Sequence, residues 1–296
     1  MNHPCYAMFG IDMETDIGSY TPYYEGVKNG TPLLLEALQH YDIYSTFYFS
    51  GICAKKNADI ARMVVDAKHE VGCHSLYHET VGDELFPLSG VTPLLPNEVA
   101  PRLQLATEWI QRACGVHPTS FRAPRLWGST AVVNALESLH YTSDCSYPMY
   151  YHRNRLFPYH PSRTDWTQIG NSPIIEIPVF ADMTMESADP QFGRDRDQWP
   201  LFRTIGAAYL LERVDHFIAM CVKMDIPCVL SFYMHPWEFW PMKESYMVGS
   251  AKIVPQQFLI QNCGKTALHQ LTLLTEGLLK RNAEFVTAQD LAGLFQ

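Results

Sequence analysis

The chain has 296 residues, of which 47% are hydrophobic and 18% are charged, a composition typical of a folded globular protein with a large core. Its formal net charge of −9 argues against nucleic acid or an anionic membrane surface as a partner, because both bind basic surfaces. No apolar run reaches the roughly 18 residues that a membrane-spanning helix needs. The sequence therefore predicts a water-exposed protein with no membrane span.

The N-terminus and the cysteines indicate a compartment. Residues 1–5 lead directly into a β-like segment, without the basic and apolar regions of a secretory signal. The eight cysteines are scattered without CxxC pairs, as expected for buried, reduced thiols. We therefore expect a cytoplasmic protein without a disulfide framework or a cysteine-zinc site.

Strand-like and helix-like segments alternate along the chain. In chain order, the predicted elements are a strand at 6–11, a helix at 30–40, a strand at 45–50, a helix at 59–67, a strand at 70–73, an irregular insertion at 82–96, a helix at 97–114, a strand at 121–123, a helix at 129–140, a strand at 142–145, a loop at 147–171, a strand at 173–180, a polar loop at 181–201, a helix at 205–224, a strand at 228–234, a helix at 266–281 and a strand at 284–287.

This alternation with short connections implies parallel strands joined by helical crossovers. Seven or eight such strands in one chain predict an α/β fold of the distorted (β/α) barrel type, and an open doubly wound sheet is the alternative. No linker, charge block or repeat divides the sequence. We therefore expect residues 1–296 to form a single domain, with residues 264–296 completing the barrel.

Polar residues follow several predicted strands at the point where each strand ends. They are Asp12, Glu14 and Asp16 after the first strand, His74 and His78 after the third, Arg122 and Arg125 around 121–123, Asp144 in 142–145, and His235 after 228–234. The carboxyl ends of barrel strands open at one mouth, where active sites of such barrels lie. These side chains are therefore expected to converge.

Two of these histidines have a spacing that suits a metal. On a helical turn, His74 and His78 would lie on one face, about 5–6 Å apart at Cβ. One carboxylate from Asp12, Glu14 or Asp16 would complete a His₂-carboxylate site with an open position. We expect one divalent ion, with zinc as first choice and cobalt, nickel, manganese or iron as alternatives.

The other polar residues at this mouth could transfer protons. A second carboxylate could accept a proton from the attacking water, with Arg122 keeping it ionised. His235 could donate a proton to a leaving amine, and Asp144 is the candidate that holds it protonated. Trp237 could wall a sugar-binding groove, or could pack at the barrel rim.

With these residues assembled, the chain resembles the polysaccharide deacetylases, the NodB-homology group of carbohydrate esterases, from about residue 8 to residue 238. The motifs appear in the family's order: GIDME at 10–14, HEVGCHSLYH at 69–78, FRAP at 121–124, SDCS at 143–146 and LSFYMH at 230–235. The resemblance implies a distorted (β/α) barrel and metal-dependent hydrolysis of an N-acetyl group. The substrate would be an acetylated amino sugar or a polysaccharide precursor.

The resemblance also implies a role for each matched residue. Glu14, His74 and His78 would bind the metal, and Asp12 would be the general base. Arg122 would position Asp12.

On the opposite side of the reaction, the resemblance makes His235 the general acid and Asp144 the residue that tunes it. The backbone N–H of Arg125 would help to bind the oxyanion.

Two departures from the family pattern keep alternatives open. The ligand carboxylate is usually an Asp next to the base, whereas Glu14 lies one residue further on, so Asp16 is an alternative ligand. Relatives with this spacing include hydrolases of small cyclic amides or ureides. In the family, the residue after the RxP motif is often aromatic; here it is Arg125, a cation that would suit an anionic substrate. A catalytically silent sugar-binding protein is a further alternative, and a homo-oligomer is possible.

Overall fold

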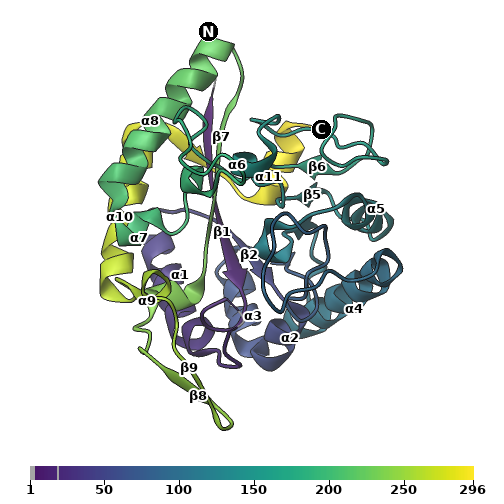
Figure 1. Cartoon of the computed structure of the whole chain (residues 1–296), viewed down its shortest axis with the longest axis vertical. Coiled ribbons are helices and arrows are strands. Elements are labelled where there is room, and N and C mark those ends of the chain that lie inside the picture. The colour runs from purple at the N-terminus through teal and green to yellow at the C-terminus, as the bar shows by residue number, and fades with distance from the viewer. Residues whose placement is uncertain (1–3, 19) are drawn as a thin grey trace.

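Parallel strands form a curved sheet at the centre of the molecule, with helices around it (Figure 1). The computed structural model describes residues 4–18 and 20–296; residues 1–3, on which part of the expectation about the N-terminus rests, lie outside the described residues, as does residue 19. The eight strands of the sheet are β1 (Cys5–Met13), β2 (Thr46–Phe49), β3 (Glu70–Cys73), β4 (Ser120–Phe121), β5 (Ser143–Asp144), β6 (Ile175–Glu176), β7 (Cys228–Met234) and β10 (Ala283–Phe285).

The sheet curls until its two ends almost meet. Strands run in the order β7-β1-β2-β3-β4-β5-β6, and all of these pairs are parallel. On the edge of β1 away from β7, β10 pairs with the first residues of β1 and β2 pairs with the last. Beyond β6, the N–H of Phe180 donates to the carbonyl of Ser231 in β7 at 2.8 Å. The predicted distorted (β/α) barrel is thereby confirmed.

Helices occupy the crossovers and the outer side of the sheet. They are α1 (Thr31–His40), α2 (Gly51–Lys56), α3 (Ala58–Asp66), α4 (Pro96–Cys114), α5 (Thr130–Ser138), α6 (Met149–His152), α7 (Leu201–Thr204), α8 (Ala207–Met224), α9 (Gln257–Ile260), α10 (Lys265–Lys280) and α11 (Ala288–Leu294). A separate antiparallel hairpin, β8 (Tyr246–Val248) and β9 (Ala251–Ile253), projects from the lower edge in Figure 1. No helix of the described residues is long and apolar enough to cross a membrane.

Some elements differ from expectation. The strand predicted at 173–180 is reduced to β6, because the imide nitrogen of Pro178 has no hydrogen to donate to a neighbouring strand. The short helices α2 and α11 and the β8–β9 hairpin were not predicted. All eight cysteines have free thiols, and six of them are buried.

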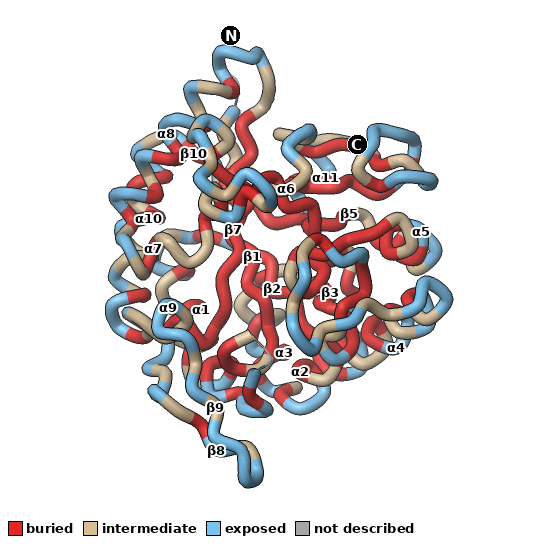
Figure 2. The backbone as a smooth tube through the Cα atoms, in the orientation of Figure 1, coloured by how far each residue is buried: buried red, intermediate tan, exposed pale blue. Residues whose placement is uncertain are grey.

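The core has two parts, one between sheet and helices and one inside the barrel, and Figure 2 shows the buried strands at the centre. Inside the barrel, Met8, Tyr48 and Val229 pack with Leu291 of α11. The N–H of Ala288 donates to the hydroxyl of Thr46, at the start of β2, at 2.9 Å. Helix α11 therefore closes the end where the strands begin and leaves the opposite end for the polar residues.

Candidate active site

The spacing of Asp12 and Glu14 follows from β-structure. Asp12 lies near the end of β1 and Glu14 just beyond it, so the two carboxylates, two residues apart, point to the same side of the strand. Both side chains are buried. One extended segment therefore delivers two acids to the mouth of the barrel.

Glu14, His74 and His78 form a cluster with the geometry of a metal site. Their ligand atoms all lie within 4.8 Å of one another. His74 Nε2 is 3.8 Å from Glu14 Oε2, and His78 Nε2 contacts the same oxygen. Glu14 Oε1 is buried and has no hydrogen-bond partner among the described residues. A divalent cation would satisfy this oxygen, so the residues present fit such an ion.

Charge in the cluster favours ligation. Burial opposes ionisation of Glu14, but the nearby imidazoles of His78, His74 and His235 outweigh it and hold the pKa of Glu14 well below its usual range. Burial lowers the pKa of His78, although Glu14 acts against this. A carboxylate beside a neutral imidazole is the protonation state that a cation requires.

His74 and His78 do not share a helical turn, and that expectation is wrong. The segment after β3 is a loop in which Ser75 and His78 both have φ of 63°, in the left-handed region. The loop nevertheless brings the two rings to a centroid distance of 5.0 Å. The Nδ1 of His74 lies 2.7 Å from the carbonyl of Arg122, which selects the tautomer that leaves Nε2 free to bind a metal.

Asp16 lies outside this cluster. Its carboxylate accepts hydrogen bonds from the backbone N–H groups of Gly26 at 2.8 Å and Glu25 at 3.0 Å. These groups begin the π-helical turn η1 (Gly26–Gly30) that runs into α1. Of the two candidate carboxylates, only Glu14 contacts the histidines.

Arg122 crosses the barrel interior to reach Asp12. Its guanidinium is fully buried, and Nη1 lies 3.0 Å from Asp12 Oδ1 in a single hydrogen bond. The guanidinium also lies over the ring of Tyr48. Gly10 leaves room for it, since a Cβ there would come within 2.2 Å of Nη1. The guanidinium of Arg122 therefore requires a glycine at position 10.

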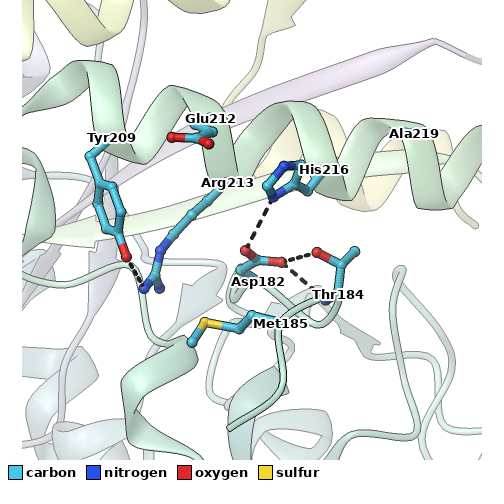
Figure 3. A pocket seen from close by; sticks show the side chains of 8 residues that line it. All are labelled: Asp182, Thr184, Met185, Tyr209, Glu212, Arg213, His216 and Ala219. Carbon is cyan, nitrogen blue, oxygen red and sulfur yellow. Dashed lines mark hydrogen bonds and ion pairs between the residues drawn. The ribbon is translucent and has the colours of Figure 1, made fainter.

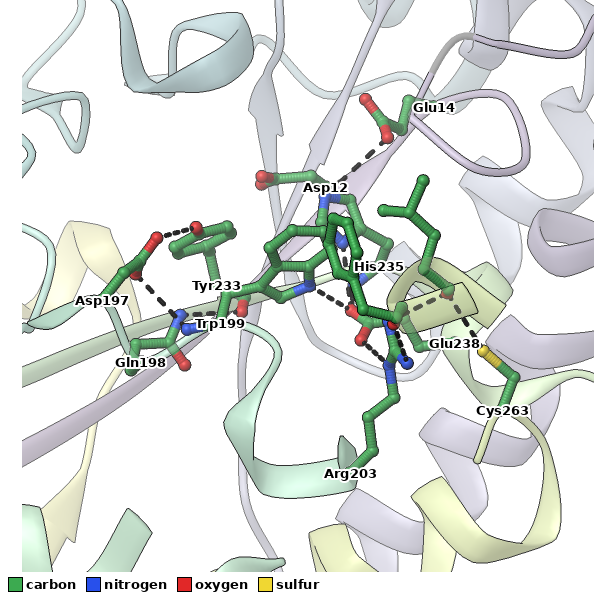
Figure 4. Close-up of polar contacts among 12 residues, drawn as sticks. Asp12, Glu14, Asp197, Gln198, Trp199, Arg203, Tyr233, His235, Glu238 and Cys263 are labelled. Atoms are coloured by element: carbon green, nitrogen blue, oxygen red, sulfur yellow. Dashed lines mark hydrogen bonds and ion pairs between the residues drawn. The ribbon is translucent and has the colours of Figure 1, made fainter. Parts of the chain in front are cut away.

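His235 lies on the other side of Glu14, with its Nε2 3.8 Å from Glu14 Oε1 (Figure 4). Its Nδ1 is 3.0 Å from Oε1 of Glu238. Burial alone would lower the pKa of His235, but the hydrogen bond to Glu238 and the charges of Glu14, Glu238 and Asp12 raise it above its usual value. His235 is therefore placed to carry a proton.

The expected pairing of Asp144 with His235 is wrong. Asp144 accepts a hydrogen bond from Ser146 and lies opposite Glu176 in the adjacent strand. Burial raises the pKa of Asp144 to about 7, and burial together with Asp144 raises that of Glu176 well above its usual range. Asp144 makes no hydrogen bond or ion pair with His235 among the described residues: its Oδ2 has no hydrogen-bond partner, and the Nδ1 of His235 faces Glu238 instead.

Arg125 and Trp237 also differ in part from expectation. Arg125, with φ of 62°, is the second residue of a 3-10 turn (Pro124–Leu126), where backbone N–H groups lack intrahelical acceptors. Its guanidinium donates to Thr80 at 3.1 Å and to the carbonyl of His78 at 3.4 Å. It therefore supports the loop after β3 that carries the two histidines. Trp237 is only 1% exposed and stacks on His235, so it packs behind the histidine and walls no open groove.

Sequence reasoning assigned no role to Glu238, Glu176 or Arg203. A Glu three residues after His235, with Pro236 between them, is the spacing of a capping box, which the structure contains. Glu176 is an acid within an apolar strand-like run, which is a weaker signal. Nothing local marks Arg203, which meets the site only through tertiary contacts.

A separate pocket lies beside α8, and Figure 3 shows its lining. Its polar groups are largely paired with one another: Asp182 accepts two hydrogen bonds from Thr184 and faces His216, and Arg213 donates to the hydroxyl of Tyr209. It contains none of the residues of the metal cluster. We assign it no role in the reaction.

Comparison with known proteins finds similarity to one family. The family model for polysaccharide deacetylase matches residues 16–143. A peptidoglycan-N-acetylglucosamine deacetylase of Bacillus cereus is 22% identical over 145 residues, which cover 49% of this chain and 58% of the relative. The chain thus spans less than two thirds of that relative's length.

Solved structures share the fold over almost the whole chain. A structure described as a polysaccharide deacetylase from Mycobacterium smegmatis superposes with a TM-score of 0.62 at 16% identity, covering 99% of this chain and 91% of that one. Puue allantoinase superposes with a TM-score of 0.61 at 14% identity, covering 99% and 92%. The resemblance expected from the motifs is confirmed.

Proposed function

We propose that this chain, a relative of the polysaccharide deacetylases, is a metal-dependent hydrolase of non-peptide C–N bonds. The observation that supports this most directly is the buried cluster of Glu14, His74 and His78. A paired carboxylate, Asp12, and a histidine, His235, come from the same mouth. Such a set combines metal ligands with groups that can accept and donate protons.

Glu14, His74 and His78 would hold one divalent ion, with zinc proposed first. When bound, the ion would polarise the amide carbonyl and lower the pKa of the attacking water. Asp12, held in place by its hydrogen bond from Arg122, accepts a proton from that water. The backbone N–H of Arg125 donates to the developing oxyanion.

His235 then donates a proton to the leaving nitrogen as the C–N bond breaks, so that the products are a carboxylate and an amine. The proton taken up at Asp12 and the one released at His235 balance over the cycle. The side chains of Asp12 and His235 act as separate base and acid, which agrees with their different partners.

The substrate that we propose is an N-acetylated amino sugar or a polysaccharide precursor. The B. cereus relative is described as a peptidoglycan-N-acetylglucosamine deacetylase. We further propose that the protein acts in the cytoplasm, on precursor-sized molecules, and that it can form a homo-oligomer.

The test is metal analysis of the purified protein combined with acetate release from N-acetylglucosamine oligomers. We expect about one divalent ion per chain, loss of activity with a chelator, and recovery when zinc or cobalt is added. His78→Ala should remove the metal and the activity, whereas His269→Ala, at an exposed helical position, should retain both. A protein that binds no divalent metal and releases no acetate with any added metal would contradict the proposal and favour a silent sugar-binding protein.

A second candidate is hydrolysis of a cyclic imide or ureide by the same residues. The one-residue gap between Asp12 and Glu14 and the shape shared with Puue allantoinase favour it. Ring opening of succinimide or allantoin, with no acetate release from sugar oligomers, would select this function instead.

A further inference from the structure

The carboxylate of Glu238 accepts hydrogen bonds from the ring and the backbone of His235, from Trp199 and from Arg203. We infer that Glu238, anchored by Arg203, is the positioning residue of His235, keeping a hydrogen on Nδ1 and turning Nε2, the nitrogen that carries the transferred proton, toward Glu14. This inference rests on the proposed function, in which His235 is the general acid. The partner of His235 is therefore not Asp144 on β5. It is Glu238, in the turn η4 (Pro236–Phe239) that directly follows His235.

The two oxygens of Glu238 are fully used. Oε1 accepts from the Nδ1 of His235 at 3.0 Å, from the backbone N–H of His235 at 2.9 Å and from Trp199 Nε1 at 2.9 Å. Oε2 accepts from Arg203 Nε at 2.5 Å (Figure 4). The side chain is completely buried, and Arg203, with burial opposing it, lowers the pKa of Glu238 to about 2. An ionised carboxylate without its own hydrogen can only accept, so the hydrogen on Nδ1 must belong to His235.

Arg203 fixes this carboxylate to a distant part of the chain. Its Nη1 donates to the carbonyls of Phe258 at 3.0 Å and Gln261 at 2.6 Å, and its Nη2 donates to that of Leu259 at 3.0 Å. The side chain of Asn262 donates back to the carbonyl of Arg203 at 2.8 Å. A rigid frame therefore stands behind Glu238, as a positioning residue requires.

Aromatic rings restrict His235 on its remaining sides. Trp237 stacks on it with a centroid distance of 5.0 Å, and Trp199 meets it edge-on at 5.4 Å. Gly26 permits this packing, because a Cβ there would lie 2.2 Å from Trp237 Cα. The imidazole is thus held in one orientation, with Nε2 as the atom left for proton transfer.

The kinetic consequence depends on the leaving group. An amine leaving from an amide must be protonated, whereas a 4-nitrophenolate ion leaves from an aryl acetate without a proton. Glu238→Gln should therefore lower kcat for the N-acetyl sugar about 100-fold, in the range of general acid catalysis, with KM changed little. For 4-nitrophenyl acetate, the same variant should lose less than about 5-fold. Glu244→Gln, at an exposed position, is the matched control.

A structural role alone would lower both rates together, and that result would overturn the inference. Selective loss of amide hydrolysis in Asp144→Asn rather than in Glu238→Gln would overturn it as well. In wild-type protein, ¹⁵N NMR of the His235 ring should report a hydrogen on Nδ1. A ring with a hydrogen on Nε2 and none on Nδ1 would contradict the inference even if Glu238→Gln fails to fold.

The NMR measurement also separates two failures. If metal-loaded wild-type protein hydrolyses nothing but the Nδ1–H tautomer is present, the proposed function fails and the positioning by Glu238 stands. If wild-type protein is active and the ring carries its hydrogen on Nε2 alone, the positioning by Glu238 fails and the proposed function stands.

Discussion

At the scale of single residues, the role of each side chain in the site depends on which of its oxygen or nitrogen atoms already make hydrogen bonds. Glu14 has a buried oxygen that accepts no hydrogen bond from the described residues, whereas both oxygens of Asp16 accept backbone hydrogen bonds. Neighbouring acids of similar burial therefore differ in what they can still bind. Direct contact separates Glu238 from Asp144 as the partner of His235, because the Nδ1 of His235 lies 3.0 Å from Glu238 Oε1, whereas Asp144 accepts from Ser146.

Separate substitutions of Glu14 and Asp16 should show which one binds the metal and which one caps the helical turn. Glu14→Gln should abolish stoichiometric metal in the purified protein, because a neutral amide binds a divalent cation weakly beside two imidazoles. Asp16→Asn should keep the metal and lower the free energy of unfolding by about 0.5–2 kcal/mol, the usual cost of losing a helix cap. Metal content and denaturant unfolding are the measurements. Loss of metal in Asp16→Asn but not in Glu14→Gln would make Asp16 the ligand.

Gly10→Ala should disturb Arg122. The added Cβ would lie 2.2 Å from Nη1, so the guanidinium must move away from Asp12. We expect a loss of about 1–3 kcal/mol in unfolding free energy, as for other overpacked cores, together with a lower kcat. Gly293→Ala is the control, because a Cβ at that helical position meets nothing within 4 Å. Equal stability of the two variants would show that Arg122 adapts without cost.

At the scale of elements, β1 carries residues of the site at one end of the barrel, and α11 closes the other end. β1 pairs with three strands and carries Asp12 toward the mouth. Helix α11 begins at a capping box formed by Thr287 and Asp290 and covers the opposite end. A closed base and an open mouth place all polar residues of the reaction at one end, as in other barrels of this type.

The closing helix should carry measurable stability. Leu291→Ala should lower the unfolding free energy by about 2–5 kcal/mol, because it leaves a cavity inside the barrel. Leu294→Ala, at a residue that is 53% exposed, should change it by less than about 0.5 kcal/mol. Chemical denaturation followed by tryptophan fluorescence would measure both. Similar values for the two variants would mean that α11 does not support the barrel.

At the scale of the whole molecule, stability should depend on pH through buried neutral histidine. His69 is 7% exposed, and its Nδ1 accepts the backbone N–H of Ser45 at 3.1 Å. Burial lowers the pKa of His69 from 6.5 to about 4. The unfolded chain therefore binds more protons than the folded chain between these values, and folding stability contributed by neutral His69 is lost as the pH falls through that window.

We expect wild-type protein to lose about 1–2 kcal/mol of stability through His69 between pH 7 and pH 5. His69→Gln should remove this part of the pH dependence, whereas His269→Gln, at an exposed position, should retain it. Unfolding curves at several pH values provide the measurement. An unchanged slope in His69→Gln would show that His69 is protonated without cost in the folded protein.

The sequence by itself determined the strands, the barrel class and the residues that meet at its mouth, because hydrophobic periodicity and residue order are local properties. Asp12, Glu14, His74, His78, Arg122 and His235 all follow strands that the pattern identifies. Parallel strands must present their carboxyl ends together, so convergence follows from topology alone. It does not depend on the conformation of any single loop.

Only the tertiary structure decided which of these side chains contact one another. The left-handed backbone at Ser75 and His78, not a helix, brings the two imidazoles together. The turn after β7 places Glu238 against His235, and Asp144 lies opposite Glu176 in the next strand. Arg203 reaches Glu238 from the short helix α7, which no local signal marks. The physical reason is that a hydrogen bond forms or fails over about 1 Å, a precision that loop geometry and long-range packing supply and residue spacing does not.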